Sequence, residues 1–158
     1  MVSPHLWRST RFNALRDTEK TLFLYLLTSE HQTSAGCFRL PDGYACDDLG
    51  WEREMLTTAR AAIVDAGLIQ HDPKSDEYLI ERFFKHCPPR NRNHRLGAER
   101  EITSLRSPDI KQAALAALFA LDGAKSLPTD DTPGEPPSPS MDARAHPLRQ
   151  VLTKRLES

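Results

Sequence analysis

The chain has 158 residues and a formal net charge of −1, which excludes a general electrostatic attraction to nucleic acids or to anionic membranes. No apolar run approaches the roughly 18 residues that a membrane span needs, and the N-terminus lacks the pattern of a signal peptide. Three cysteines without a close C-x-x-C pair argue against a disulfide framework and fit a reducing compartment. We therefore expect a soluble, cytoplasmic protein without a membrane partner.

Residues 18–50 predict a helix, a short strand and a second helix. The stretch from Thr18 to Ser29 places leucines and a phenylalanine on one helical face, and Asp17 or Thr18 can cap its start. The sequence GCFRLP, residues 36–41, has glycine at its start and proline at its end, which is typical of a short strand. The next nine residues favour a short helix ending at Gly50, a residue suited to the left-handed position after a helix.

Residues 51–84 predict a longer helix and a β-hairpin. Apolar residues recur from Leu56 to Ala66 at spacings of three and four, so that one helical face is apolar. Segments 68–72 and 77–84 flank Pro-Lys-Ser-Asp, residues that favour a turn. The order of helix, strand, helix, helix, strand, strand is that of a winged helix-turn-helix whose hairpin is the wing. We therefore predict a mainly α fold with a small β-hairpin.

The third predicted helix is the candidate recognition helix. In a helix-turn-helix, the N-terminal residues of the second helix reach base edges in the major groove. Arg53, Thr57 and Arg60 follow one another at helical spacing along one flank, and Lys74 lies at the predicted hairpin tip. These four residues are candidate nucleic-acid contacts, although Lys74 is equally compatible with a solvated turn.

Acidic residues surround these candidates and leave an alternative open. Arg53 can pair with Asp48, and Arg60 can pair with Glu52 or Asp65, so that both arginines serve only as surface ion pairs. Up to residue 87 the chain has ten lysines and arginines against thirteen acids. We therefore expect any base readout by this helix to be modest, because the acids repel phosphates.

Positive charge is concentrated just after the predicted hairpin. Residues 88–100 contain four arginines and one acid. Two prolines and two asparagines in KHCPPRNRNHR, residues 85–95, predict an irregular strap rather than a helix. Arginine forks and asparagine amides suit phosphates and base edges, and the alternative is a solvated basic linker. The candidate contacts in the strap are Lys85, Arg90, Arg92, Asn93, His94 and Arg95.

Two further helices are predicted at residues 96–105 and 107–123. Ser107 can cap the second one with proline at its first position. Its wide apolar face includes Leu115, Leu118 and Phe119. We favour packing of this face within the chain, but a homodimer contact or docking on a partner remains open for these three residues.

The C-terminal quarter differs in composition. Residues 122–147 are rich in proline, small polar residues and acids, which predicts a disordered linker. Residues 148–158 space their leucines as in a short amphipathic helix, with Leu152 as the candidate partner contact. A solvated tail and a tethered docking peptide are both compatible with this pattern.

Catalytic patterns are missing from the sequence. It contains no G-x-x-x-x-G-K-[ST], no G-x-G-x-x-G and no H-E-x-x-H. His86, Cys87 and His94 do not have the usual spacing of zinc ligands. We therefore predict that the protein is not an enzyme and that it has no cofactor and no metal site.

Between Trp7 and His94 the chain resembles the winged-helix domain of phage-encoded replication proteins, the replisome-organiser or DnaD-type group. The resemblance is carried by LFLYLLTSEHQTSAGCFRLPDGYACDDLGW, AIVDAGLIQHD and ERFFKHCPPRNRNH. It implies DNA binding during replication initiation and transfer of the DNA to a helicase or its loader.

We therefore predict a non-catalytic DNA-binding protein of phage replication initiation that acts on duplex DNA, with single-stranded DNA as a further candidate ligand. Its expected parts are a winged helix-turn-helix domain (1–87), the basic strap with a helical extension (88–121), the linker (122–147) and the tail helix (148–158). Two alternatives remain open. One is a protein–protein adaptor, such as a phage-encoded inhibitor of a host complex, and the other is a dimeric transcriptional repressor.

Overall fold

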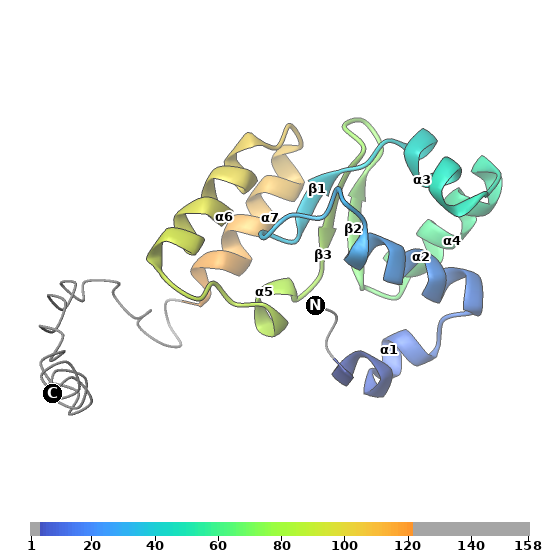
Figure 1. Ribbon diagram of the computed structural model, residues 1–158, viewed down its shortest axis with the longest axis horizontal. Coiled ribbons are helices and arrows are strands. Elements are labelled where there is room, and N and C mark those ends of the chain that lie inside the picture. The colour runs from blue at the N-terminus through green and yellow to red at the C-terminus, as the bar shows by residue number, and fades with distance from the viewer. Residues whose placement is uncertain (1–3, 122–158) are drawn as a thin grey trace, which may run out of the picture.

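A computed structural model describes residues 4–121 of the protein (Figure 1). Within this range the fold is mainly helical with one small antiparallel sheet, as the sequence predicts. The elements in chain order are η1 (Pro4–Arg8), α1 (Thr10–Asn13), α2 (Asp17–Thr28), β1 (Cys37–Arg39), α3 (Asp42–Leu49), α4 (Arg53–Asp65), β2 (Ile69–Asp72), β3 (Glu77–Ile80), α5 (Phe83–His86), α6 (Arg92–Ser104) and α7 (Pro108–Phe119).

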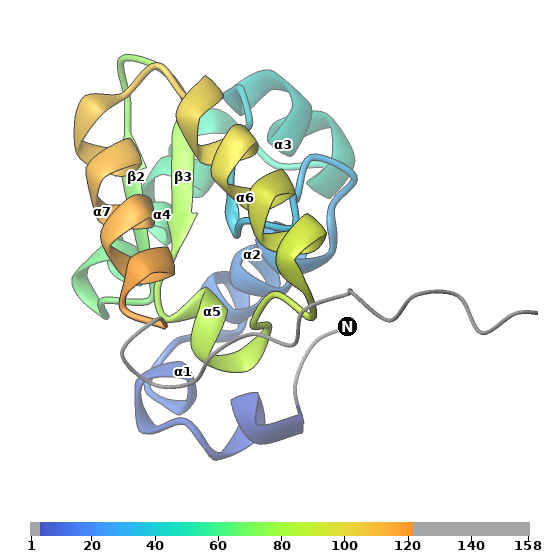
Figure 2. The same ribbon diagram turned by 90° about the vertical axis from the view of Figure 1, so that its left-hand side faces the viewer.

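The sheet has the strand order β1-β3-β2, and both pairings are antiparallel. In the central strand β3, Leu79 lies opposite Cys37 of β1 and opposite Gln70 of β2. Every residue of β3 is buried, because helices cover both faces of the sheet (Figures 1 and 2). The predicted turn between β2 and β3 is confirmed, and the Lys74 backbone N–H donates to the Asp72 carboxylate within it.

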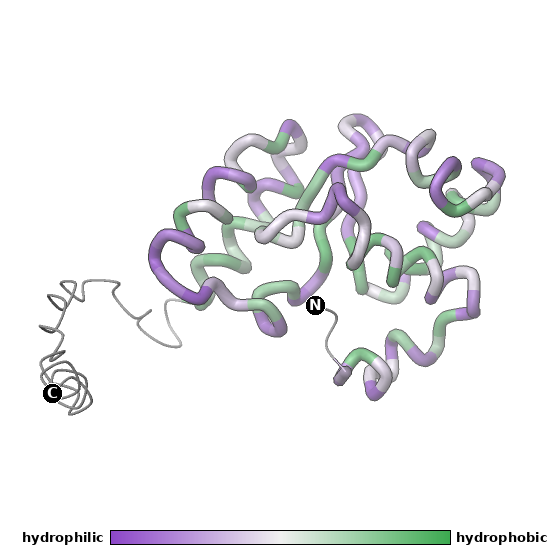
Figure 3. Tube along the Cα trace, viewed as in Figure 1, coloured by the Kyte–Doolittle hydropathy of each residue, from purple (hydrophilic) through white to green (hydrophobic). Residues whose placement is uncertain are grey.

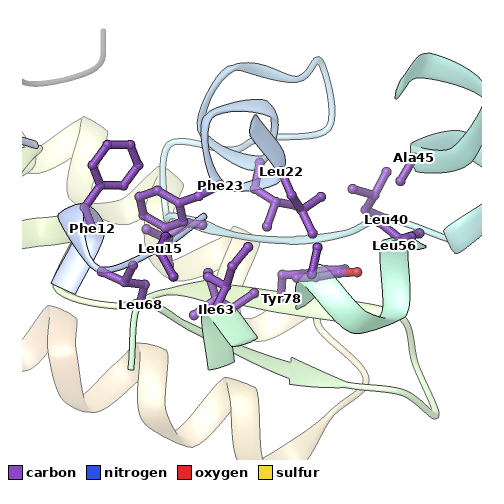
Figure 4. Close-up of a cluster of buried hydrophobic side chains, with 14 of the residues drawn as sticks. Phe12, Leu15, Leu22, Phe23, Leu40, Ala45, Leu56, Ile63, Leu68 and Tyr78 are labelled. Atoms are coloured by element: carbon purple, nitrogen blue, oxygen red, sulfur yellow. The ribbon is translucent and has the colours of Figure 1, made fainter. Parts of the chain in front are cut away.

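Helices α2, α3 and α4 lie on one face of the sheet and enclose the larger core. The predicted apolar face of α4 is confirmed, since Leu56 and Ile63 are fully buried. In Figure 4 both side chains converge with Leu22 and Tyr78 between the helices and the sheet. Helix α3 ends at Gly50, whose φ of 64° is the left-handed conformation that the sequence predicts there.

Helices α6 and α7 cover the opposite face of the sheet and form a second core with it. A buried carboxylate fixes their position: Glu77 of β3 accepts the backbone N–H groups of Arg106 (2.8 Å) and Ser107 (2.7 Å), which link the two helices. The predicted cap of α7 is present, because the Ser107 hydroxyl accepts the Ile110 N–H. The buried residues of this core are Ala35, Cys37, Leu79, Phe84, Ala98, Ile102, Leu105, Ile110, Ala114 and Leu118.

The predicted strand at residues 77–84 is too long. β3 ends at Ile80, and the chain turns at Arg82, whose φ is 58°, into the short helix α5. The turn brings Phe83 against Gly36, where an added Cβ would lie 2.2 Å from Cγ of the phenylalanine ring. Long-range packing of Phe83 and of the buried Phe84 therefore overrides the local preference of these residues for a strand.

The prediction of an irregular strap at residues 85–95 is also wrong. Helix α5 includes Lys85 and His86, and helix α6 begins at Arg92. The Asn91 side chain accepts the His94 N–H (2.8 Å) and caps α6, so that Arg92, Asn93 and His94 form its first turn. Only the short connection around the two prolines is irregular.

The helical extension is part of one packed unit with the sheet, because the second core joins α6 and α7 to β1 and β3. The predicted boundary at residue 87 therefore lies inside this unit. The predicted linker 122–147 and tail helix 148–158, with Leu152, lie outside the described residues. Between residues 4 and 121, every helix is too short or too polar to cross a membrane.

Candidate nucleic-acid interface

Arg60 of α4 is not available for nucleic acid. The residue is 9 % exposed, and its guanidinium donates to both carboxylate oxygens of Asp42 and to the Tyr78 hydroxyl. Burial opposes its charge, but the hydrogen bonds to Asp42 and Tyr78 raise the pKa of Arg60 above its usual value. The prediction of a nucleic-acid contact is wrong here, because Asp42 holds the arginine inside the fold.

The other candidates on α4 and the hairpin are exposed. Arg53 pairs with Asp42, not with Asp48, at 3.2 Å between Nη1 and Oδ2. The Thr57 hydroxyl donates to the Arg53 backbone carbonyl (2.8 Å), which leaves its oxygen able to accept a further hydrogen bond. Lys74 is exposed at the hairpin tip. Of these side chains, only Lys74 carries a charge without an ion-pair partner within residues 4–121.

The outward face of α4 is acidic and apolar. Glu54 and Asp65 are exposed on it, and Glu52 is exposed just before its first turn. Met55 and Val64 are 46 % and 38 % exposed, and they flank this face on opposite sides because nine residues make two and a half turns. A helix with these side chains repels phosphates and offers apolar surface, which is unusual for the reading helix of a DNA-binding domain.

Cationic side chains of the described residues are concentrated in a different place. Residues 82–100 contain six lysines and arginines and one acid. We define the basic surface by seven side chains: Arg82, Lys85, His86, Arg90, Arg92, Arg95 and Arg100. All are exposed except Arg95, which is half-buried, and Figure 3 shows the hydrophilic run where α5 leads into α6.

The basic surface is free for a ligand in the described part of the chain. Apart from Arg95, none of its lysine and arginine side chains makes an ion pair within residues 4–121. Figures 1 and 2 place α6 across the sheet from α3 and α4. The two predicted DNA-contacting regions, α4 and the arginine-rich segment, therefore face different sides of the molecule.

The start of α6 adds to the positive potential. Backbone N–H groups in the first turn of a helix lack partners within the helix and carry the positive end of its dipole. Asn91 satisfies the N–H of His94, while Arg92 and Asn93 lie at the exposed end. His94 is half-buried, and its Nδ1 accepts the Arg90 N–H (3.2 Å), which fixes the ring beside the basic surface.

Most of the residues predicted as partner contacts on α7 pack inside the protein. Leu118 is fully buried in the second core, so its prediction as a partner contact is wrong. Leu115 is partly buried against the same core. Phe119 is 48 % exposed, and the Arg95 guanidinium lies over its ring at 5.6 Å from the centroid. The favoured packing of this apolar face within the chain is thereby confirmed.

Four residues important to these surfaces were not among the candidate nucleic-acid contacts. Arg82, His86 and Arg100 belong to the basic surface, and the excess of cations from residue 82 to 100 was a sufficient signal for them. Asp42 holds both arginines of α4, and no local pattern links it to residues 11 and 18 positions away.

No protein-family model, no curated protein and no solved structure matches the chain. The resemblance to phage replication proteins therefore stays a prediction from the sequence. Among the residues from 4 to 121, no three histidine, cysteine or acidic side chains lie close enough together to hold a metal ion.

Proposed function

We propose that the protein is a non-catalytic nucleic-acid-binding protein that holds the phosphate backbone on its basic surface. The observation that carries the proposal is the segregation of charge. The arginines of α4 are both paired with Asp42, whereas five cations of the basic surface have no ion-pair partner in the described chain. An unpaired cluster of this kind attracts a polyanion even though the net charge is −1.

Phosphate contact is the mode that these side chains suit. Guanidinium groups bind phosphate oxygens with two parallel hydrogen bonds, and each neutralised phosphate releases condensed counterions. The outward N–H groups at the start of α6 favour an anion in the same place. Contacts to phosphate position a protein without reading bases, so we expect weak dependence on DNA sequence.

This proposal changes the role of α4. A straight duplex lying on the basic surface would be separated from α4 by the sheet, as Figure 2 illustrates. Binding therefore does not require base readout by Arg53 or Thr57. A role in phage replication initiation, with transfer of DNA to a helicase or its loader, is supported by the sequence resemblance alone and forms the biological part of the proposal.

The test is binding of labelled duplex and single-stranded DNA at 50 and 200 mM salt. The wild-type affinity for duplex DNA should fall roughly a hundredfold between these concentrations if about four phosphates are contacted. Arg90→Ala/Arg92→Ala should weaken binding at 50 mM and reduce the log–log salt slope by about 2.

The matched control removes two cations from the other end of the same helix pair. Arg106→Ala/Lys111→Ala changes the net charge equally and should leave the affinity within about twofold of wild type. Equal losses in both variants would show that only net charge matters. No binding of either DNA at 50 mM salt would overturn the proposal.

A protein–protein adaptor is the second candidate function. It is favoured by α4, where Met55 and Val64 are exposed on opposite flanks of the helix and both arginines are paired. If DNA binding is absent, an interaction that is lost on Met55→Asp/Val64→Asp but kept in Arg90→Ala/Arg92→Ala would support the adaptor.

A further inference from the structure

The described chain ends beside the basic surface. Helices α6 and α7 run antiparallel, so the last turn of α7 lies next to the first turn of α6 (Figure 2). The contact of the Arg95 guanidinium with the Phe119 ring, at 5.6 Å, joins these two turns. Whatever follows residue 121 therefore leaves the fold within reach of the basic surface.

The first part of the sequence that follows is acidic. Residues 122–142, which we call the acidic segment, contain five acids and one lysine, whereas residues 82–100 contain six lysines and arginines and one acid. The two stretches are thus of opposite charge and of similar length. The acids are Asp122, Asp130, Asp131, Glu135 and Asp142.

We propose that the acidic segment binds the basic surface of its own chain and competes there with nucleic acid. Its carboxylates take the positions that phosphates would take on the unpaired arginines. Occupancy of the surface does not depend on the function proposed above, whereas competition with nucleic acid rests on it.

Distance poses no obstacle to this contact. Twenty-one residues span up to about 70 Å when extended, whereas the part of α6 from Arg92 to Arg100 is about 12 Å long. Covalent attachment also keeps the local concentration of the carboxylates in roughly the millimolar range. Weak individual ion pairs can therefore suffice for occupancy, and added salt should release the segment, since exposed pairs are screened.

The experiment uses the full chain with carboxylates replaced by amides. The test variant neutralises four acids of the segment, and the control variant neutralises four exposed acids that lie outside it, with the same change in net charge. The test variant is Asp130→Asn/Asp131→Asn/Glu135→Gln/Asp142→Asn, and the control is Glu30→Gln/Asp47→Asn/Glu54→Gln/Asp65→Asn.

The first measurement needs no nucleic acid. Backbone amide NMR shifts of residues 82–100 should differ between the test variant and wild type at low salt, and the difference should disappear at high salt. The control variant should show wild-type shifts at these residues. Identical shifts in wild type and the test variant would overturn the proposal, whether or not the protein binds nucleic acid.

The second measurement is the affinity for labelled duplex DNA at 50 mM salt. The test variant should bind about tenfold more tightly than wild type, because roughly four weak exposed ion pairs no longer compete. The affinity of the control variant for duplex DNA should rise clearly less than that of the test variant. Equal gains in both variants would attribute the effect to net charge and overturn competition. If no variant binds DNA, the proposed function fails, and the NMR shifts alone decide occupancy.

Discussion

Replacing Asp42 with alanine should leave the guanidinium of Arg60 inside the fold without its ion-pair partner. The two side chains are 15 % and 11 % exposed, so neither charge is well hydrated. Removal of one partner from a buried ion pair typically costs about 3–5 kcal/mol. Arg60 keeps its hydrogen bond to the Tyr78 hydroxyl (2.8 Å), which lowers the expected cost to about 2–3 kcal/mol.

The opposite change should cost less. In Arg60→Met, the methionine fills the apolar space of the arginine stem, and Asp42 keeps its contact with Arg53 at 3.2 Å. We expect a loss of about 1–2 kcal/mol. The double variant removes both charges together, so its loss should be smaller than the sum of the single losses by about 1–2 kcal/mol.

The assay is urea denaturation of the four proteins at pH 7, followed by circular dichroism. Equal m-values would show that the variants unfold from the same structure, and the midpoints then give the free energies of unfolding. Additive losses, with no coupling between Asp42 and Arg60, would refute the assignment of this pair as a buried structural interaction. Additive losses would also make Arg60 a candidate contact for nucleic acid again.

Two further predictions concern His71 and Gly36. Burial, followed by the charge of Arg60, lowers the pKa of His71 from 6.5 to about 4, and its buried Nε2 has no hydrogen-bond partner among residues 4–121. The unfolded chain therefore binds the proton more readily, and stability should fall by roughly 1–2 kcal/mol, allowing for solvent screening, as the pH drops from about 6.5 to 4. His71→Phe should flatten this pH dependence of the urea midpoint, and an unchanged slope would contradict the assignment. Gly36→Ala should cost about 2–4 kcal/mol, because φ is 69° and the new Cβ would meet the Phe83 ring. Gly43→Ala, which meets nothing within 4 Å, should be neutral or stabilising in the same thermal or urea melt.

Elements defined by neighbouring residues were predictable from the sequence. The apolar face of α4, the left-handed Gly50 after α3 and the Ser107 cap of α7 each depend on residues within one or two turns. The hairpin turn at residues 73–76 is of the same kind. Such features follow from backbone geometry and local hydrogen bonds, which the order of residues determines directly.

The start of α6 shows how a local pattern can mislead. The prolines and asparagines before it predict an irregular strap, yet Asn91 uses its side chain to cap a helix. An irregular strap and a capped helix start both agree with the local preferences of proline and asparagine. Packing of Ala98 and Ile102 in the second core favours the helix, because residues four apart lie on the same helical face and both reach the sheet.

The charge pattern of the chain follows from the order of its residues alone: a mildly acidic N-terminal half, a basic run from residue 82 to 100 and the acidic segment from 122 to 142. Which of these charges form internal pairs depends on how the elements pack in three dimensions. Asp42 reaches Arg60 across 18 positions, and Glu77 reaches Ser107 across 30. Such pairs form where packed elements cross, and their burial removes them from the surface. The cations of the basic surface lie on the far side of the sheet from α4, and we propose that these bind a polyanion.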